Sequence, residues 1–288
     1  MHGVGIIELL LIIFVAGILG GLFGSLSGLG GGAVIVPLLS IYLGFPLYYA
    51  TGASLISTIA TSTGSASQYV KSRMANMRIG LSLSVGTTLG AITGSLLAVY
   101  MYSSHLDSII FIIFGVVLLG ASSLELERLF RKRAHGKARP DWTTRLLGLN
   151  GKYYDEAARR EIYYEGRRWH MAIGVMFIAG LLSGLLGIGS GALKVLGMDL
   201  IMGLPIKVTT TTSNFMIGVT AATSSGIYWA HGFIQPLIVA PAAIGVLIGA
   251  LIGAHILPRL PRKEIKAIFI AIVMVLGVQM VLRGLGIA

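Results

Sequence analysis

Apolar residues occur in long runs along nearly the whole chain, and short polar or basic stretches separate these runs. A full crossing of a membrane takes about 20 apolar residues, and eight of the ten runs approach that length. The runs at 33–43 and 192–202 are too short to cross. The ten are Ile6–Ser27, Ala33–Leu43, Thr51–Val70, Gly80–Tyr102, Ser108–Leu124, Met171–Leu186, Ala192–Met202, Val208–Trp229, Pro236–Leu257 and Ile265–Leu285. The pattern predicts an all-α integral membrane protein with about eight full transmembrane helices and two short or broken ones.

A glycine-rich tract precedes each of the two short runs, at Gly28–Ala33 and at Gly187–Ala192. Each short run leads at equal distance into Gly-x-Pro and then into a segment rich in Ser and Thr. A constant offset of 159 residues superimposes the two halves, so the chain contains an internal duplication. Each half has an odd number of elements, which predicts that the second half is inserted upside down. Inverted repeats with broken helices are typical of secondary transporters.

Composition agrees with a membrane protein, since 55% of the residues are hydrophobic and 11% are charged. The chain has no cysteine, which excludes disulfides, iron–sulfur clusters and cysteine-ligated zinc. No P-loop and no His-Glu-x-x-His motif occurs, and the histidines do not stand at metal-ligand spacing. We therefore expect no enzyme activity, no metal and no cofactor.

The net charge of +11 is concentrated between the apolar runs rather than in a nucleic-acid-binding surface. Residues 125–170 contain twelve Lys or Arg, 71–78 contain three and 259–266 contain four. Cytoplasmic loops carry such an excess, so the positive-inside rule predicts a multi-pass protein of the cell membrane with both termini external. The division is an N-terminal transmembrane repeat 1–124, a basic cytoplasmic loop 125–170 and a C-terminal repeat 171–288.

Aromatic and basic residues are interleaved in the loop 125–170, a mixture that suits the headgroup level of a membrane. We expect contact with membrane lipids and a surface helix over Asp155–Trp169. The simplest role is an anchoring linker, and a regulatory or partner-binding role is the alternative. The aromatic residues are Trp142, Tyr153, Tyr154, Tyr163, Tyr164 and Trp169.

The glycine tracts are candidates for an anion site. Irregular backbone at membrane depth is tolerated only against protein or a water-filled cavity, and a helix that begins there directs free N–H groups at that cavity. The alternative is that the glycines only permit close helix packing. The candidate backbone positions are Gly30, Gly31, Gly32, Gly189, Ser190 and Gly191.

Small polar side chains recur at spacings of 3 and 4 in the run after each Gly-x-Pro, which places them on one helix face. In the first half these are Thr51, Ser54, Thr58, Thr61, Ser65 and Gln68, with Ser57 close by; in the second they are Thr210, Ser213, Thr220 and Ser224, with Asn214 close by. We interpret these faces as the walls of a polar pathway. Substrate hydrogen bonds are expected from Ser54, Ser57, Thr58, Ser213 and Asn214.

Lys194 lies inside the second short run, three residues after Gly191, and its counterpart in the first half is Ile35. An ionisable residue at membrane depth is costly and points to function, and a cation beside a helix N-terminus strengthens an anion site. The alternative is a lysine that extends to the membrane surface. Asp199 lies about 140° around the helix from Lys194, too far round to pair with it. It sits at the water boundary or carries a coupling proton.

With these residues in place, the chain resembles the sulfite exporter TauE/SafE family of membrane permeases. The resemblance is carried by the stretch from Gly21 to Gly32, by Gly44-Phe45-Pro46, by the second-half copies from Gly180 to Asn214, and by the glycine-rich segment Gly86–Leu97. It covers essentially everything except the central loop, which is longer than expected for the family.

The resemblance implies export of a small sulfur-containing anion, sulfite or an organosulfonate, with coupling to protons. The anion would bind where the two short helices converge. A passive anion channel with the same lining is one alternative, and a membrane scaffold acting through residues 125–170 is another. The cargo, the direction of flux and the oligomeric state stay open, a homodimer included.

Overall fold

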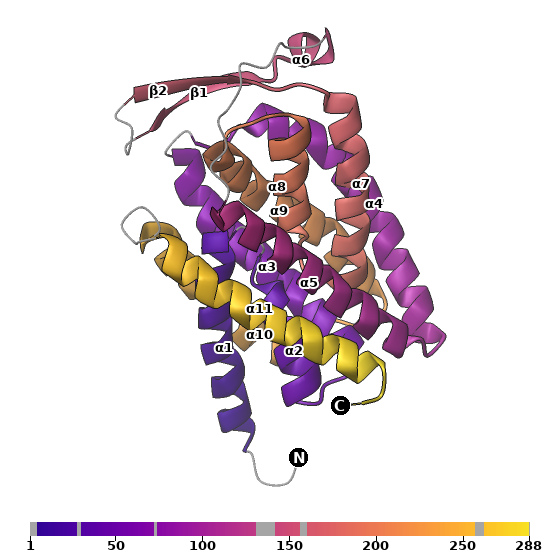
Figure 1. Cartoon of the computed structure of the whole chain (residues 1–288). Coiled ribbons are helices and arrows are strands. Elements are labelled where there is room, and N and C mark those ends of the chain that lie inside the picture. The colour runs from indigo at the N-terminus through magenta and orange to yellow at the C-terminus, as the bar shows by residue number, and fades with distance from the viewer. Residues whose placement is uncertain are drawn as a thin grey trace.

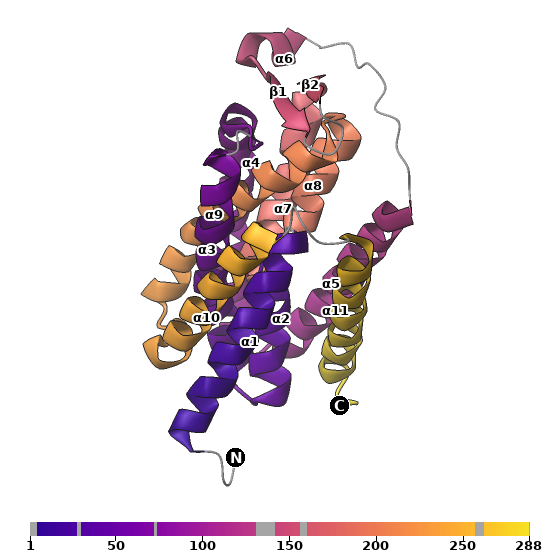
Figure 2. The same ribbon diagram turned by 90° about the vertical axis from the view of Figure 1, so that its left-hand side faces the viewer.

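The computed structural model describes residues 5–27, 30–71, 74–130, 142–155, 160–256 and 262–287. Long helices lie beside one another, and a two-stranded hairpin covers one end of them (Figure 1). Both termini lie at the end opposite the hairpin, as Figures 1 and 2 show from two sides.

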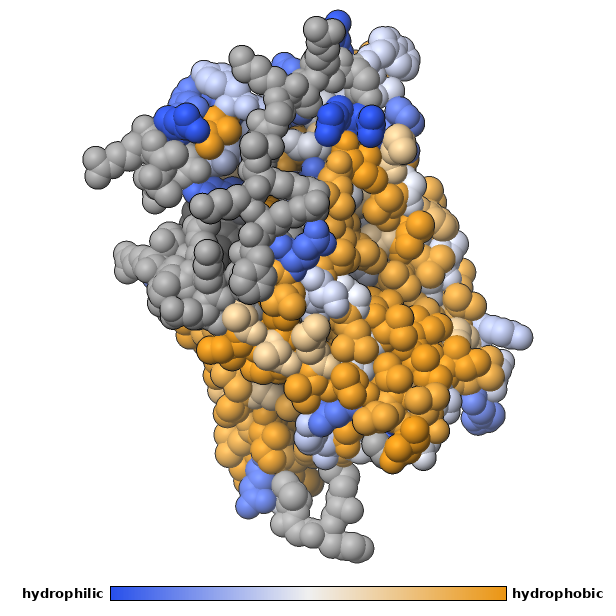
Figure 3. All heavy atoms as spheres, viewed as in Figure 1, coloured by the Kyte–Doolittle hydropathy of each residue, from blue (hydrophilic) through white to orange (hydrophobic). Residues whose placement is uncertain are grey.

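Six described helices are long and apolar enough to cross a membrane. Their outward faces are apolar, as Leu81, Val85 and Leu89 on α4 illustrate, each more than half exposed at a spacing of four. Figure 3 shows the resulting apolar band across one face. Such a surface is stable only in lipid, so the chain is a multi-pass membrane protein. The six helices are α1 (Ile6–Ser27), α4 (Met77–Ser103), α5 (Asp107–Phe130), α7 (Trp169–Leu186), α10 (Pro236–Ile256) and α11 (Arg262–Gly284).

Two further helices, α3 (Leu47–Lys71) and α9 (Ile206–Ala230), have 25 residues each and carry the hydroxyl-rich faces. They pack against each other, α3 also packs on α10, and α9 also packs on α4. Most of the hydroxyl side chains on their predicted polar faces are buried in protein. The predicted polar faces thus lie inside the helix bundle.

Glycines allow two helix pairs to approach at backbone distance. A Cβ on Gly90 of α4 would lie 2.8 Å from the nitrogen of Leu181 on α7, and one on Gly249 of α10 would lie 2.8 Å from the nitrogen of Leu22 on α1. Gly90 and Gly249 are counterparts under the offset of 159 residues. The pairs α4–α7 and α1–α10 therefore use the same close packing, as small residues do between membrane helices.

The two short helices are present where the hydrophobic pattern predicts them. The helix α2 (Gly32–Pro37) continues as the π-helix η1 (Leu38–Tyr42), and α8 (Gly191–Leu196) continues as the π-helix η2 (Gly197–Ile201). The π segments occupy matching positions in the two halves. A proline does not explain them, because Pro37 corresponds to Leu196.

The central loop differs from the prediction. After the short helix α6 (Trp142–Leu147), strand β1 (Asn150–Asp155) pairs antiparallel with β2 (Arg160–Glu165). The predicted surface helix over Asp155–Trp169 is therefore wrong, while the all-α membrane fold is confirmed for the rest of the described chain. The segment Arg-Glu-Ile-Tyr-Tyr-Glu favours a strand through its β-branched and aromatic residues. An ion pair between Lys152 and Glu161 (3.1 Å) bridges the strands. Its hydrogen bonds lower the pKa of Glu161 and raise the pKa of Lys152.

The hairpin is fastened to the helices beneath it. Leu149 is fully buried in a cluster with Met198, Met202 and other apolar residues of the second half. The Nδ2 group of Asn76, the residue before α4, donates to the carbonyl of Asn150 (3.2 Å) and to the Tyr164 hydroxyl (3.0 Å). Burial raises the pKa of Tyr164, and the hydrogen bond from Asn76 partly offsets it. The hairpin is thus part of the packed structure.

Candidate functional site

The two glycine turns meet at the middle of α3 and α9. A Cβ on Gly30 would lie 3.4 Å from Cγ2 of Thr58 and 3.7 Å from Cγ2 of Ile217, and a Cβ on Gly189 would lie 3.0 and 2.8 Å from the same two atoms. Gly30 corresponds to Gly189 and Thr58 to Ile217 under the offset of 159. Two pairs of equivalent residues therefore surround one point in the bundle.

Hydroxyl groups of α3 hold both turns. The N–H of Gly31 donates to the Thr61 hydroxyl (3.3 Å), and the Ser54 hydroxyl donates to the carbonyl of Gly187 (2.7 Å). Gly32 sits against the same group, since a Cβ there would lie 2.8 Å from that carbonyl oxygen. A helix of the first half thus positions the turn of the second half.

A side chain of α9 holds the second turn at the point where the turn enters α8. The Ser213 hydroxyl donates to the carbonyl of Gly191 (3.2 Å). The turn is conformationally special, with φ of +71° at Gly187, +71° at Gly189 and +46° at Ser190. Glycine adopts such angles without strain, while a serine at positive φ is uncommon.

Lys194 does not extend to the membrane surface, because its side chain is 0% exposed. Its ammonium donates to the carbonyl of Gly189 (2.8 Å) and to the Thr220 hydroxyl (2.8 Å). Neither partner is charged, and within the described residues no carboxylate, Asp199 included, pairs with Lys194. A buried cation held only by neutral dipoles is poorly compensated and would be stabilised by an anion.

Several buried polar groups of α3, α7, α9 and the second turn have no hydrogen-bond partner among the described residues. Such groups are rare in folded proteins and each costs about 1–3 kcal/mol unless a water or ligand satisfies it. They are Ser57 Oγ and Thr58 Oγ1 on α3, Asn214 Oδ1 and Nδ2 on α9, Ser224 Oγ on α9, Ser183 Oγ on α7 and Ser190 Oγ in the second turn.

Backbone donors are also free at the start of α8. The N–H groups of Gly191, Ala192 and Leu193 open this helix, and no hydrogen bond in the described part of the chain uses them. The α-helical turn continues into η2, so the helical segment is longer than α8 alone. Free N–H groups at a helix start attract anions.

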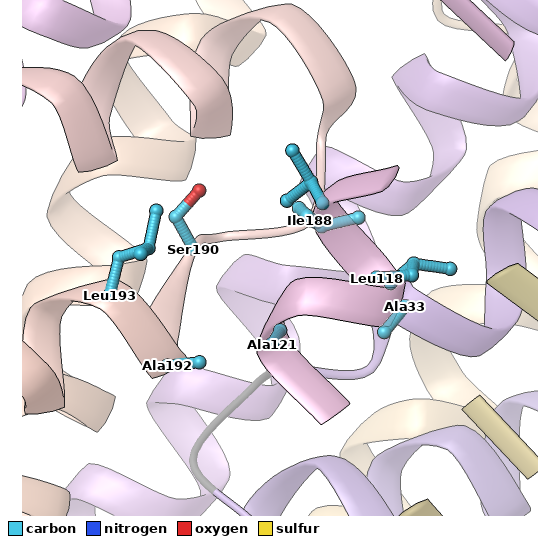
Figure 4. A pocket seen from close by; sticks show the side chains of 8 residues that line it. Ala33, Leu118, Ala121, Ile188, Ser190, Ala192 and Leu193 are labelled. Atoms are coloured by element: carbon cyan, nitrogen blue, oxygen red, sulfur yellow. The ribbon is translucent and has the colours of Figure 1, made fainter. Parts of the chain in front are cut away.

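A narrow pocket lies between the two short helices and α5, lined by Ser190 as its hydrophilic residue and by apolar side chains. Figure 4 shows these side chains gathered around the turn that leads into α8. Its room for water is about 20 Å³, enough for roughly one water molecule. The lining residues are Ala33, Val117, Leu118, Ala121, Ile188, Ser190, Ala192 and Leu193.

The structure brings most of the predicted site residues together around the turns, directly or through the contacts above. It adds Thr220 as the partner of Lys194, and Ser183 one turn before Gly187. Thr220 belongs to the hydroxyl face that the sequence indicates, whereas Ser183 stands in an otherwise apolar helix and gives no periodic signal. Gly28 and the side chain of Gln68 lie outside the described residues.

The fold defines a multi-pass membrane protein, and comparison with known proteins identifies its class as a membrane transporter. The family described as Sulfite exporter TauE/SafE matches residues 13–280, so the chain belongs to this family. It is 30% identical to the "Probable membrane transporter protein YunE" of Bacillus subtilis (strain 168), over 95% of this chain and 98% of that protein. It is 28% identical to "Probable membrane transporter protein YjnA" of the same organism, over 93% and 98%. No solved structure matches the chain.

Proposed function

We propose that this transporter exports a small sulfur-containing anion, sulfite or an organosulfonate, in a proton-coupled cycle. The observation that carries the proposal is Lys194, a fully buried cation without a carboxylate partner in the described chain, beside a turn with free N–H groups. Family membership supplies the substrate class. An oxyanion would provide the missing counter-charge.

The donors around the turns match the chemistry of such an anion. Sulfite and sulfonate oxygens only accept hydrogen bonds, and the free N–H groups, the ammonium and the orphan hydroxyl and amide groups can all donate. The binding residues in this proposal are Gly30, Gly31, Gly32, Ser54, Ser57, Thr58, Gly189, Ser190, Gly191, Lys194, Ser213 and Asn214. A wet, electropositive pocket would form here when the halves separate from their close packing.

The transport cycle in this proposal uses two inverted repeats. Helix contacts support it: α1 packs on α10 as its counterpart α7 packs on α4, and α2 packs on α3 as α8 packs on α9. In Figure 1, α1 starts at the end with the termini and α7 starts at the hairpin end. The helices α3 and α9 would cross the membrane inside the six apolar ones, which gives eight full crossings. Rocking of one half against the other would expose the site alternately.

The orientation follows from charge. Arg78, Lys152 and Arg167 stand at or near the hairpin end, and basic residues favour the cytoplasm. The hairpin would then be cytoplasmic and both termini external, in the cell membrane. Contacts with lipids surround the apolar band, and a homodimer remains compatible with this arrangement.

Flux measurements with purified protein in liposomes test the proposal. Vesicles are loaded with sulfite, methanesulfonate, sulfate or acetate, and efflux is followed with and without a pH gradient. We expect sulfite or the sulfonate to leave fastest, and the gradient to drive flux against its concentration. Anion flux that runs only down its own concentration gradient and does not respond to the pH gradient would indicate a passive anion channel. Equal, background-level flux for all four anions would refute the proposal.

A further inference from the structure

A cluster of aromatic side chains closes the helix bundle at the end where the termini lie. Phe233, in the loop between α9 and α10, stands at its centre. Its ring centroid lies 5.0 Å from that of Tyr48, 5.7 Å from Tyr102 and 5.9 Å from Tyr228. The four rings come from the start of α3, the end of α4, the end of α9 and the loop. Tyr228 is 0% exposed and Tyr102 is 6% exposed, while Tyr48 and Phe233 are partly buried, so the cluster has a buried side toward the bundle and a partly exposed side at this end.

This cluster lies next to the candidate site, on the side where the termini lie. The Tyr102 hydroxyl is 3.0 Å from the hydroxyl of Thr51, the first residue of the polar face of α3. The Cγ2 atom of Thr51 would be 2.8 Å from a Cβ on Gly187, in the second glycine turn. Two helical turns separate Thr51 from Thr58, about 10 Å along the axis. The aromatic layer is therefore what stands between the turns and this end of the bundle.

Two contacts tie the cluster to the turn itself. The Tyr228 hydroxyl donates to the carbonyls of Gly184 (3.2 Å) and Leu185 (3.3 Å), at the end of α7 just before the turn. Opening of the layer at Tyr228 would free these carbonyls. A rearrangement of the turn and a rearrangement of the layer are thus mechanically linked.

The loop that carries Phe233 lies outside both helices that it joins, α9 and α10. Gly232 has φ of +73°, and a Cβ there would meet nothing within 4 Å. The carbonyl of Phe233 rests against Gly52 of α3, where any side chain would collide with it. A short loop with an exposed glycine at positive φ and one partly buried aromatic side chain has the features of a hinged closure.

Phe233 and Tyr48 correspond to non-aromatic residues of the other half, which lie toward the hairpin end. The offset of 159 residues places Met74 where this end has Phe233, and Lys207 where it has Tyr48. At the hairpin end the carbonyl of Met74 accepts a hydrogen bond from Thr211 (3.0 Å), the counterpart of Gly52. The two ends of the passage are therefore closed by different chemistry.

We propose that Phe233, together with Tyr48, Tyr102 and Tyr228, forms the barrier that separates the anion site from the terminus side, and that Phe233 must swing out for the anion to pass. The inference rests on the proposed function, since it takes the passage along α3 and α9 as the substrate route. It assigns a role to these four aromatic residues, which are not part of the proposed anion site.

Single-cysteine accessibility tests the barrier without any substrate. The chain has no cysteine, so Ser57→Cys introduces the only thiol, nearly isosteric with a fully buried hydroxyl. An anionic, membrane-impermeant methanethiosulfonate reagent is applied from the terminus side, and the modification rate is measured. If the open state is a minor population of about 0.1–10%, Phe233→Ala should raise the rate about tenfold or more.

The control is Tyr100→Ala in the same reporter background, because Tyr100 lies at the same end of α4 but is 66% exposed and outside the cluster. It should leave the rate unchanged. Folding is checked by size exclusion, and Phe233→Leu replaces Phe233→Ala where the latter does not fold. A rate that is the same with and without Phe233 overturns the barrier. Sulfite efflux is measured separately, so absent transport by the native chain would refute the function instead.

Discussion

At the scale of single residues, the buried ammonium of Lys194 is the clearest link between structure and transport. It donates to the carbonyl of Gly189, and in the proposed function it supplies the positive charge for the anion. Hydrogen bonds to charged groups contribute about 1.5–3 kcal/mol, so Lys194→Met should lower anion flux by about 10- to 100-fold. Initial rates of sulfite efflux from proteoliposomes measure the effect.

Two variants separate charge from general damage. Lys152→Met removes an exposed lysine of the hairpin and should leave flux unchanged. Thr220→Val removes the second partner of Lys194 and should cause a smaller loss than Lys194→Met, because the charge remains. Native flux in Lys194→Met, at equal protein per vesicle, would remove this lysine from the site.

Gly32 tests the contact between the two halves. A Cβ there would collide with the Ser54 hydroxyl and lie 2.8 Å from the carbonyl of Gly187. Overpacking of this kind typically costs about 1–3 kcal/mol, so Gly32→Ala should lower the thermal midpoint in detergent and reduce flux. Gly120→Ala is the matched control, since nothing lies within 4 Å of that position. It should be neutral or stabilising by up to about 1 kcal/mol. Equal midpoints for the two variants would contradict the contact.

Sequence periodicity predicts which residues share a face but not which residues of distant segments touch. The spacing of Ser54, Thr58 and Thr61 indicates one polar face, and the structure does bury these side chains. The hydrogen bond from Ser54 to Gly187 spans 133 residues and depends on how the halves pack. The partner of Lys194 on α9 is hidden from the sequence for the same reason.

At the scale of elements, the junction between α4 and the hairpin depends on one side chain. The Oδ1 atom of Asn76 accepts from the N–H of Ile79 (3.2 Å) and caps α4, while its Nδ2 group holds Asn150 and Tyr164. Loss of a cap costs about 0.5–2 kcal/mol. Asn76→Ala should lower the thermal midpoint and expose the hairpin to limited proteolysis.

Asn76→Asp distinguishes the two roles, because a carboxylate keeps the cap and cannot donate to the hairpin. We expect this variant to lose the protease protection of the hairpin and to retain most of the thermal stability. If Asn76→Asp and Asn76→Ala behave alike in both measurements, the hairpin contacts carry the stability and the cap does not.

The short helices were predictable from sequence, and the hairpin was not. A run of about eleven apolar residues behind a glycine tract is too short to cross, and this physical limit holds in any fold. The segment 150–165 carries both interface-like composition and strand propensity. Composition favours a surface helix there, whereas the cross-strand pair of Lys152 and Glu161 forms only once β1 and β2 meet. Cross-strand pairs of this kind cannot be read from composition, which is why the hairpin was not predicted.

At the scale of the whole molecule, the internal duplication means that most helix contacts occur twice, once for each half. The pairs α1–α10 and α7–α4 are equivalent, and so are the contacts of α2 with α3 and of α8 with α9. Differences between the halves then stand out: Lys194 against Ile35, Asn214 against Leu55, Phe233 against Met74. All three departures put the cation, the amide and the aromatic ring in the second half of the chain, so any asymmetry of the proposed passage would come from that half.

The proposed inverted arrangement makes a prediction about sidedness, and the lack of native cysteine makes it simple to test. Ser104 lies in the turn between α4 and α5 and Lys152 lies in the hairpin, at opposite ends of the bundle. In intact cells an impermeant maleimide should label Ser104→Cys and spare Lys152→Cys until the membrane is opened, because the basic hairpin end is expected in the cytoplasm. His231→Cys, in the loop between α9 and α10, should behave like Ser104→Cys if the second half is inverted. Labelling of His231→Cys and Ser104→Cys from opposite sides would rule out this topology, and with it a passage that the two halves open in turn.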